Sequence, residues 1–223
     1  MALVVVDVET AGEDPARHHL IAIGAAVLLG DGTVASTHCW VLDDFSDDMS
    51  GSGWSPRCVA EFWGPSGQQP QLLRTLTSRH RVSPTVAASE LLKVITDAYD
   101  AHGSVALGSD YPCFDVAWVN ALLLRTGHTT INMATGRWLP CIDTDSFADG
   151  VKAAMGRPYT PPAGNELTHV PEEDAAIIAR SHAYHLVQAG MFEQLNTFAC
   201  TRSFAWGFMC AVSFIGLLAY CMN

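Results

Sequence analysis

Apolar residues fall first into three strand-like runs. Residues 3–8 are almost continuously apolar and β-branched, which is typical of a strand buried on both faces of a sheet. Residues 20–29 and 33–42 are also strand-like, and Asp31-Gly32 between them is a hairpin signal. The pattern therefore predicts three leading antiparallel strands.

Helical spacing dominates further along the chain. Ser55-Pro56 predicts a short helix that carries Phe62 and Trp63, and Ser83-Pro84 starts a longer helix that ends near His102. Short strands are expected at 104–108 and 139–142, and helices at 115–125, from 144 to 155, and from 171 to about 196. Strands followed by alternating strands and helices predict an α/β fold with a mixed sheet flanked by helices, plus a C-terminal apolar helix.

That C-terminal segment has its own pattern. Residues 203–223 contain no charged residue and are apolar on every side. At about 1.5 Å per residue a helix of this length reaches the roughly 30 Å of a bilayer core. We therefore expect a domain at 1–198 and a transmembrane anchor at 203–222, with Arg202 favouring a cytoplasmic catalytic domain. A terminal helix packed onto the domain is the alternative.

Composition narrows the function classes. The formal net charge of −11 argues against a broad basic surface that grips nucleic acid non-specifically, although a metal-containing pocket for a strand end stays open. Seven scattered cysteines without a C-x-x-C pair indicate reduced thiols rather than a disulfide framework or a zinc knuckle.

Two carboxylates stand at the end of the first strand. Asp7 and Glu9 are two positions apart, so an extended backbone projects both to one face. Like charges this close repel each other unless a cation or a proton neutralises them, which indicates a divalent metal site. The plainer reading is a polar strand end that enters a loop.

Two further motifs follow in a fixed order. Phe114-Asp115 lies at a predicted helix start, and His169 precedes Asp174 by five residues at another. Together with D-x-E on the first strand, this series resembles the DEDD exonuclease superfamily, the DnaQ-like or RNase T-like group, in its histidine-containing subgroup. Residues 61–63, 71–74 and 138–144 are similar to its phage and bacterial exoribonuclease branch. One departure is Pro171, where that family usually has a small residue.

The resemblance implies a ribonuclease H-like fold and two Mg²⁺ or Mn²⁺ ions, hard cations that prefer oxygen ligands. It assigns the metal ligands to Asp7, Glu9, Asp115 and Asp174. It makes His169 the base that takes a proton from water.

For the substrate, Thr10 and Ala11 are expected to cradle the terminal nucleotide, and Phe62 or Trp63 to stack on a base. The implied partners are single-stranded RNA or DNA 3′ ends. Dimers are common in this superfamily, so a homodimer is also an expectation.

Several residues have simpler readings. Asp115 could be a helix cap, Asp110 is its rival as a ligand, and Asp143 is expected to cap a helix. Glu172 and Glu173 fit first-turn charges. Four histidines are expected at the surface, and four basic residues form a cluster that contacts either phosphate or solvent: His18, His19, His182 and His185, and Arg74, Arg79, His80 and Arg81.

These observations predict a membrane-tethered, metal-dependent 3′-5′ exonuclease that releases nucleoside 5′-monophosphates. A catalytically inactive membrane adaptor with the same fold is the competing hypothesis, and a soluble nuclease with a structural tail is another.

Overall fold

A six-stranded mixed sheet forms the centre of the computed structural model, which describes residues 1–155 and 166–191. Its strand order is β4-β3-β2-β1-β5-β6. The three leading strands, β1 (Ala2–Thr10), β2 (Leu20–Leu29) and β3 (Val34–Leu42), pair in antiparallel fashion, as predicted. Strands β5 (Val105–Ser109) and β6 (Cys141–Asp143) continue the sheet parallel to β1, and the short β4 (Arg81–Val82) pairs with β3.

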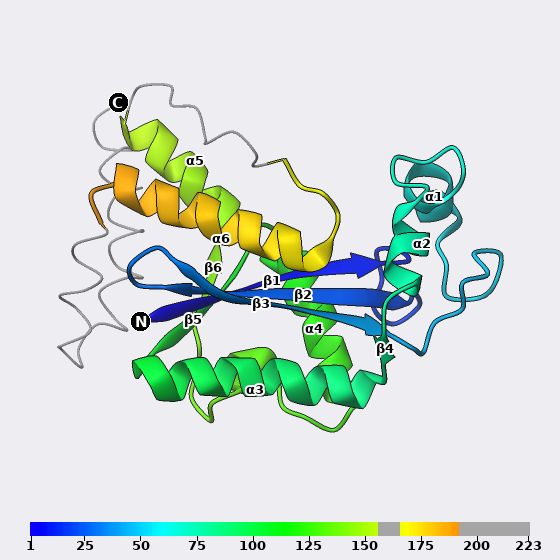
Figure 1. Cartoon of the computed structure of the whole chain (residues 1–223), viewed down its shortest axis with the longest axis horizontal. Helices are drawn as coiled ribbons and strands as arrows, with labels where there is room; N and C mark the ends of the chain where they lie inside the picture. The colour runs from blue at the N-terminus through cyan, green and yellow to red at the C-terminus, as the bar shows by residue number, and fades with distance from the viewer. Residues whose placement is uncertain (156–165, 192–223) are drawn as a thin grey trace.

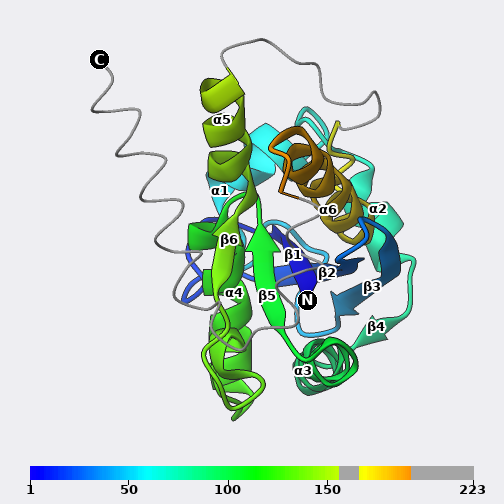
Figure 2. The same cartoon turned by 90° about the vertical axis from the view of Figure 1, so that its left-hand side faces the viewer.

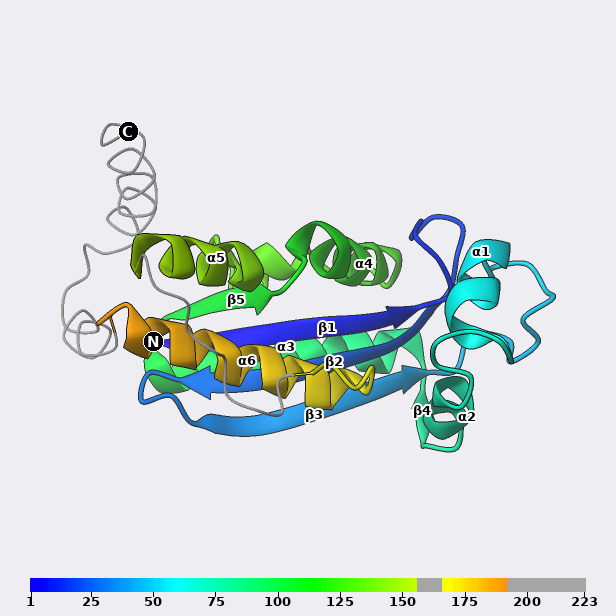
Figure 3. The same ribbon diagram turned by 90° about the horizontal axis from the view of Figure 1, so that it is seen from above.

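Helices cover both faces of this sheet (Figures 1 and 2). One face carries α3 (Pro84–His102) and α4 (Pro112–Arg125), and the other carries α6 (Pro171–Gln188) with α5 (Thr144–Met155) beside it. Two short helical segments, α1 (Pro56–Cys58) with the turn at Val59–Trp63 and α2 (Leu72–Thr77), lie beyond the end of β1 (Figure 3). The α/β fold with a mixed, helix-flanked sheet is therefore confirmed.

The alternation along β1 determines which side chains reach which layer. Val4, Val6 and Val8 join the core under α3 and α4, whereas Leu3 and Val5 pack with α6. Asp7 and Glu9 share the parity of Leu3 and Val5, so they project toward the α6 face. Both acids thus lie where the first turn of α6 meets the sheet.

Some element boundaries differ from the sequence prediction. Helix α4 begins at Pro112 rather than at Asp115, because proline fits the first helical position and Tyr111 precedes it as the N-cap. Asp143 caps α5 as predicted, since its carboxylate accepts from the Ser146 amide at 2.8 Å. Helix α2 and β4 were not predicted because both are short and lack periodicity.

The prediction that His182 and His185 are surface residues is wrong. They are only 3% and 2% exposed, because α6 is covered by the sheet on one side and by α5 on the other. The His182 ring contacts Phe147 with ring centroids 4.8 Å apart. Burial lowers the pKa of His182 to about 4, so this residue is neutral near pH 7 and belongs to the packing.

The final helix ends at Gln188 rather than near Asn196, with Ala189 as its C-cap and Gly190 at a φ of 67°. Two other predicted segments, the loop at 156–164 and the anchor at 203–222, lie outside the described residues. Within the residues that are described, no helix combines the length and the apolar character needed to cross a bilayer.

Gly24 allows the first turn of α6 to approach the sheet. It lies on β2 directly opposite Asp7, and a Cβ atom at this position would stand 2.0 Å from the carbonyl oxygen of Pro171. No other residue type fits between two backbones this close. The glycine therefore sets the height of α6 above the two acids of β1.

Gly24→Ala should lower the free energy of unfolding by about 1–3 kcal/mol, because the methyl group forces two backbones apart. Gly150→Ala is the matched control: a Cβ at Gly150 meets nothing within 4 Å in α5, so the same change should stabilise by up to about 1 kcal/mol. Urea unfolding of both variants checks this. Equal effects would show that the contact with Pro171 does not limit the packing.

Candidate active site

Four carboxylates from three distant parts of the chain meet at the carboxyl end of β1. Asp7 and Glu9 come from β1, Asp115 from the first turn of α4, and Asp174 from the first turn of α6. They are 9%, 7%, 4% and 1% exposed, respectively. The charges of Glu9, Asp115 and Asp174 all act on Asp7, so the structure brings together the four acids that the sequence singled out.

Burial and mutual repulsion make Asp7, Glu9 and Asp115 reluctant to ionise. Burial, followed by the charge of Glu9, raises the pKa of Asp7 well above its usual value. Burial also raises the pKa of Glu9 and that of Asp115 to about 7. Among the described residues, His169 is the one basic side chain that forms an ion pair with this group. A group of buried acids with so little positive charge is costly when ionised, so it favours binding of either protons or cations.

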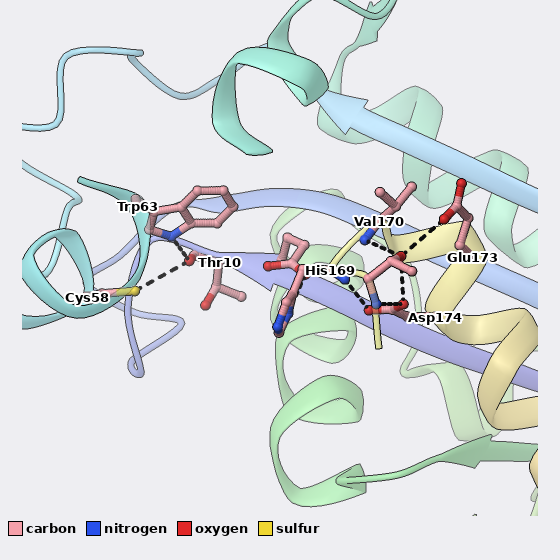
Figure 4. Close-up of polar contacts among 9 residues, drawn as sticks. Thr10, Cys58, Trp63, His169, Val170, Glu173 and Asp174 are labelled. Carbon is pink, nitrogen blue, oxygen red and sulfur yellow. Dashed lines mark hydrogen bonds and ion pairs between the residues drawn. The ribbon is translucent and has the colours of Figure 1, made fainter. Parts of the chain in front are cut away.

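Asp174 holds the loop that carries His169 (Figure 4). Its two carboxylate oxygens accept from the backbone amides of Thr168 and His169, each at 2.7 Å. The Thr168 hydroxyl donates to the same carboxylate at 3.0 Å. These bonds keep His169 at a φ of 61°, a left-handed conformation that is rare for a residue with a Cβ.

This conformation turns the His169 ring toward Glu9. The Nδ1 atom lies 3.6 Å from Glu9 Oε1, and this contact with the Glu9 carboxylate raises the pKa of the imidazole. The ring also meets Phe62 edge to face, with centroids 4.8 Å apart. His169 therefore enters the site, with Pro171 at the first position of α6.

The residues present fit a divalent cation. Among the described residues, Glu9, His169 and Asp174 offer ligand atoms that lie within 4.8 Å of one another. Oδ2 of Asp7 is buried without a hydrogen-bond partner, which is the condition expected of a ligand oxygen. The oxygen-rich donor set matches Mg²⁺ or Mn²⁺. That group of three contains two of the four predicted ligands, Glu9 and Asp174, together with His169. The other two predicted ligands, Asp7 and Asp115, lie outside it.

Asp115 is oriented by a residue that sequence reasoning missed. The Ser109 hydroxyl, at the end of β5, donates to Asp115 Oδ2 and accepts from the Tyr111 amide at 3.0 Å. Ser109 is completely buried. Asp110, the rival ligand, is less buried than Asp115, and burial with the charge of Asp145 raises its pKa. The contact of Ser109 favours Asp115 over Asp110, and nothing in the local sequence signals it.

An ion pair fixes the same turn of α6 from the other side. Arg79 Nη1 donates to Glu172 Oε1 at 2.6 Å and approaches Cys39 Sγ at 3.4 Å. Cys39 is opposite Gly24 on β3, and burial raises the pKa of its thiol to about 12, so it packs as a neutral group. Sequence reasoning placed Arg79 in a basic cluster and Glu172 among dipole charges, and their pairing was missed.

A hollow of about 230 Å³ opens beside the acids. Thr10, Phe62 and Phe114 line it, with a polar rim that contains Glu13, Arg57, Glu61 and Gln68. The carbonyl of Thr10 is held by the indole N–H of Trp63 at 2.9 Å (Figure 4). Trp63 is 1% exposed, so the structure favours Phe62 as the stacking residue and gives Trp63 the task of fixing Thr10.

Ala11 is buried between two backbone segments. Its amide donates to the His19 carbonyl and its carbonyl accepts from the Ser55 amide, both at 2.8 Å. Its side chain is completely covered. Ala11 thus shapes the loop beyond Thr10 and offers no side-chain surface to a ligand.

Comparison with known proteins finds neither a matching family model nor a matching curated protein. Solved structures do match. The single-stranded DNA complex of Escherichia coli exonuclease I is similar at a TM-score of 0.58 and 14% identity, over 88% of this chain and 43% of that chain. Exonuclease I from Methylocaldum szegediense is similar at a TM-score of 0.59 and 12% identity, over 86% and 42%.

The chain thus spans less than half the length of these exonucleases. At this identity the likeness concerns the fold alone. The protein therefore has the nuclease-like α/β fold of exonuclease I.

Proposed function

We propose that the protein is a metal-dependent 3′-5′ exonuclease that hydrolyses single-stranded nucleic acid ends to nucleoside 5′-monophosphates. The observation that carries this proposal is the convergence of four buried acids and one histidine at the carboxyl end of β1, on a fold shared with exonuclease I. The order of the three motifs supports the histidine subgroup of the DnaQ-like superfamily and its phage and bacterial branch.

Two bound Mg²⁺ or Mn²⁺ ions supply charge neutralisation for the attacking and leaving oxygens of a phosphodiester. The residues that would hold them are Asp7, Glu9, Asp115 and Asp174. Glu9 and Asp174 lie nearest to His169 and therefore belong to the side of the site where the attacking water is deprotonated. The charges of Glu9, Asp115 and Asp174 all act on Asp7, which would suit Asp7 as a ligand shared by both ions.

His169 accepts the proton of that water. If its Nδ1–H donates to Glu9 Oε1, the other ring nitrogen, Nε2, carries the free lone pair that a base needs. Phe62 packs against the ring and limits its rotation. The bonds from Thr168 and His169 to Asp174 hold the imidazole in this position before substrate arrives.

The terminal nucleotide occupies the hollow beside Thr10. Phe62 and Phe114 offer aromatic surface there, and stacking on aromatic rings accepts any base. The similar structures include an exonuclease I complex with single-stranded DNA and one with bound product. We propose a 3′ end of single-stranded DNA or RNA as the substrate.

The C-terminal segment at 203–222 is proposed to anchor this domain to a membrane with the catalytic part in the cytoplasm. Its support is the apolar sequence alone, with Arg202 before it. A homodimer likewise stays a prediction.

Asp7→Asn should reduce nucleotide release to the background rate, because it removes a buried charge from the group that holds the cations. Asp143→Asn is the matched control, since Asp143 caps α5 and should keep full activity. End-labelled DNA and RNA oligonucleotides, incubated with Mn²⁺ and resolved by size, give the readout. An Asp7→Asn protein that remains active would place the chemistry elsewhere, and an inactive wild type would favour the adaptor.

Cation binding should raise the melting temperature of the wild type more at about pH 8 than at about pH 5. Burial raises the pKa of Glu9 and of Asp115 to about 7, so their ionisation costs folding free energy as the pH rises through 7. A bound cation offsets that cost, whereas at low pH protons already do so. Melting curves with Mn²⁺ should show a smaller shift for Asp7→Asn than for Asp143→Asn. Equal shifts in both variants would indicate non-specific binding.

Removing residues 203–223 should move the protein from the detergent phase to the aqueous phase while nucleotide release is retained. The physical reason is the loss of a charge-free apolar segment long enough to span a bilayer. Detergent partitioning of the two proteins, with circular dichroism as a folding control, provides the measurement. A truncated protein that unfolds would instead favour a terminal helix packed on the domain.

A further inference from the structure

Most basic side chains are already engaged in ion pairs. Ten of the twelve Lys and Arg residues lie in the described ranges, and six of them form salt bridges at 3.7 Å or less: Arg57, Arg79, Arg81, Lys93, Arg125 and Lys152. These include two of the three arginines, Arg79 and Arg81, from the basic cluster that the sequence offered for phosphates. Such pairs leave little positive charge for a nucleic acid backbone.

The remaining four described cations do not form a track that leads to the site. Arg137 precedes β6, which runs parallel to β1, so it lies toward the opposite end of the sheet. Arg180 is nine residues along α6 from Pro171, roughly 13 Å from the first turn. Arg17 and Arg74 belong to the loop after β1 and to α2, on two separate segments near the site.

Negative charge, in contrast, surrounds the site. Glu13 and Glu61 stand on the rim of the hollow with side chains 58% and 63% exposed, and they share Arg57 as their partner. Asp145 lies close enough to Asp110 for its charge to raise the pKa of Asp110, after burial. Phosphates beyond the scissile one would therefore meet a rim on which two carboxylates outnumber the one arginine, Arg57.

The contacts that the hollow offers to a strand are uncharged and involve a single nucleotide. The hollow of about 230 Å³ presents Phe62 and Phe114 to a base, and the Thr10 carbonyl is fixed from behind by Trp63. Stacking of one terminal nucleotide contributes the same free energy whatever the length of the strand. Strand length thus adds repulsion without adding attraction.

We propose that the substrates of this site are oligonucleotides only a few nucleotides long, bound through the terminal nucleotide and the scissile phosphate. This inference rests on the proposed exonuclease activity. It predicts a salt dependence opposite to that of proteins that grip a phosphate backbone. In those proteins affinity falls as salt rises, with a log–log slope of about −0.7 for each neutralised phosphate of a single strand.

The first test compares a trinucleotide with a strand of about twenty nucleotides at salt concentrations from about 20 to 200 mM and constant Mn²⁺. Screening weakens repulsion between the acidic protein and the long strand, so its kcat/KM should stay level or rise. The trinucleotide should change less than twofold and be the better substrate at low salt. A long strand that is preferred at low salt and loses tenfold or more on adding salt overturns the inference.

A second test removes backbone charge from the substrate. In a strand of eight nucleotides, every linkage except the terminal one is replaced by an uncharged methylphosphonate. Its kcat/KM should equal or exceed that of the all-phosphate strand. A tenfold loss would reveal phosphate contacts upstream of the cut. Arg74→Gln should leave the ratio of long-strand to trinucleotide kcat/KM unchanged, whereas a selective loss on the long strand would identify a backbone contact and overturn the inference.

Binding separates failure of this inference from failure of the proposed activity. Fluorescence anisotropy of the labelled trinucleotide and of the long strand is measured without divalent ions. If neither strand is hydrolysed, the exonuclease proposal fails, and the binding comparison still decides the length preference. Equal or weaker binding of the long strand at low salt supports the inference, and tighter binding overturns it.

Discussion

Four buried carboxylates at the carboxyl end of β1 are the constraint on which the rest of the site depends. Without neutralisation, bringing Asp7, Glu9, Asp115 and Asp174 together is unfavourable twice over, through desolvation and through mutual repulsion. The protein tolerates this arrangement because a large core on both faces of β1 holds the strand in place. The site is therefore unfavourable locally and is stabilised by packing elsewhere, a pattern common in functional sites.

Most of the restraints on the site act on the first turn of α6. Gly24 lets that turn descend onto the sheet, and the pair between Arg79 and Glu172 holds it from the side of β3. Asp174 then uses both oxygens to tie down the loop before the helix. Because the carboxylate of Asp174 is bound to two backbone amides, it has little freedom to move. Restraint of this kind keeps reactive groups aligned in enzymes. The same bonds restrain His169, whose backbone has a φ of 61°.

The acids could be predicted from the sequence, but most of the residues that position them could not. Strand alternation identified Asp7 and Glu9, because it places them on one face. The resemblance of the ordered motifs to the DEDD exonucleases identified Asp115, His169 and Asp174. Ser109 and the Arg79–Glu172 pair could not be predicted, since each contact joins segments that only tertiary structure brings together. Gly24 did leave a signal, because a glycine inside a β-branched run indicates close backbone approach. The two histidines of α6 were misjudged because helical periodicity does not reveal whether a second layer, here α5, covers the outer face.

The placement of the basic residues bears on the proposed binding of cations by the four acids. Among the described residues, no Lys or Arg forms a salt bridge with Asp7, Glu9, Asp115 or Asp174, and the one charged partner recorded for them is His169. A lysine beside Asp7 would keep the carboxylate ionised, but it would also compete with a divalent ion for the same oxygens. Pairing the arginines with Asp44, Asp47 and Glu172 instead leaves the oxygens of the site available to metal. The same distribution offers little counter-charge to a long polyanion, so the proposed dependence on metal and the proposed preference for short strands have one common origin.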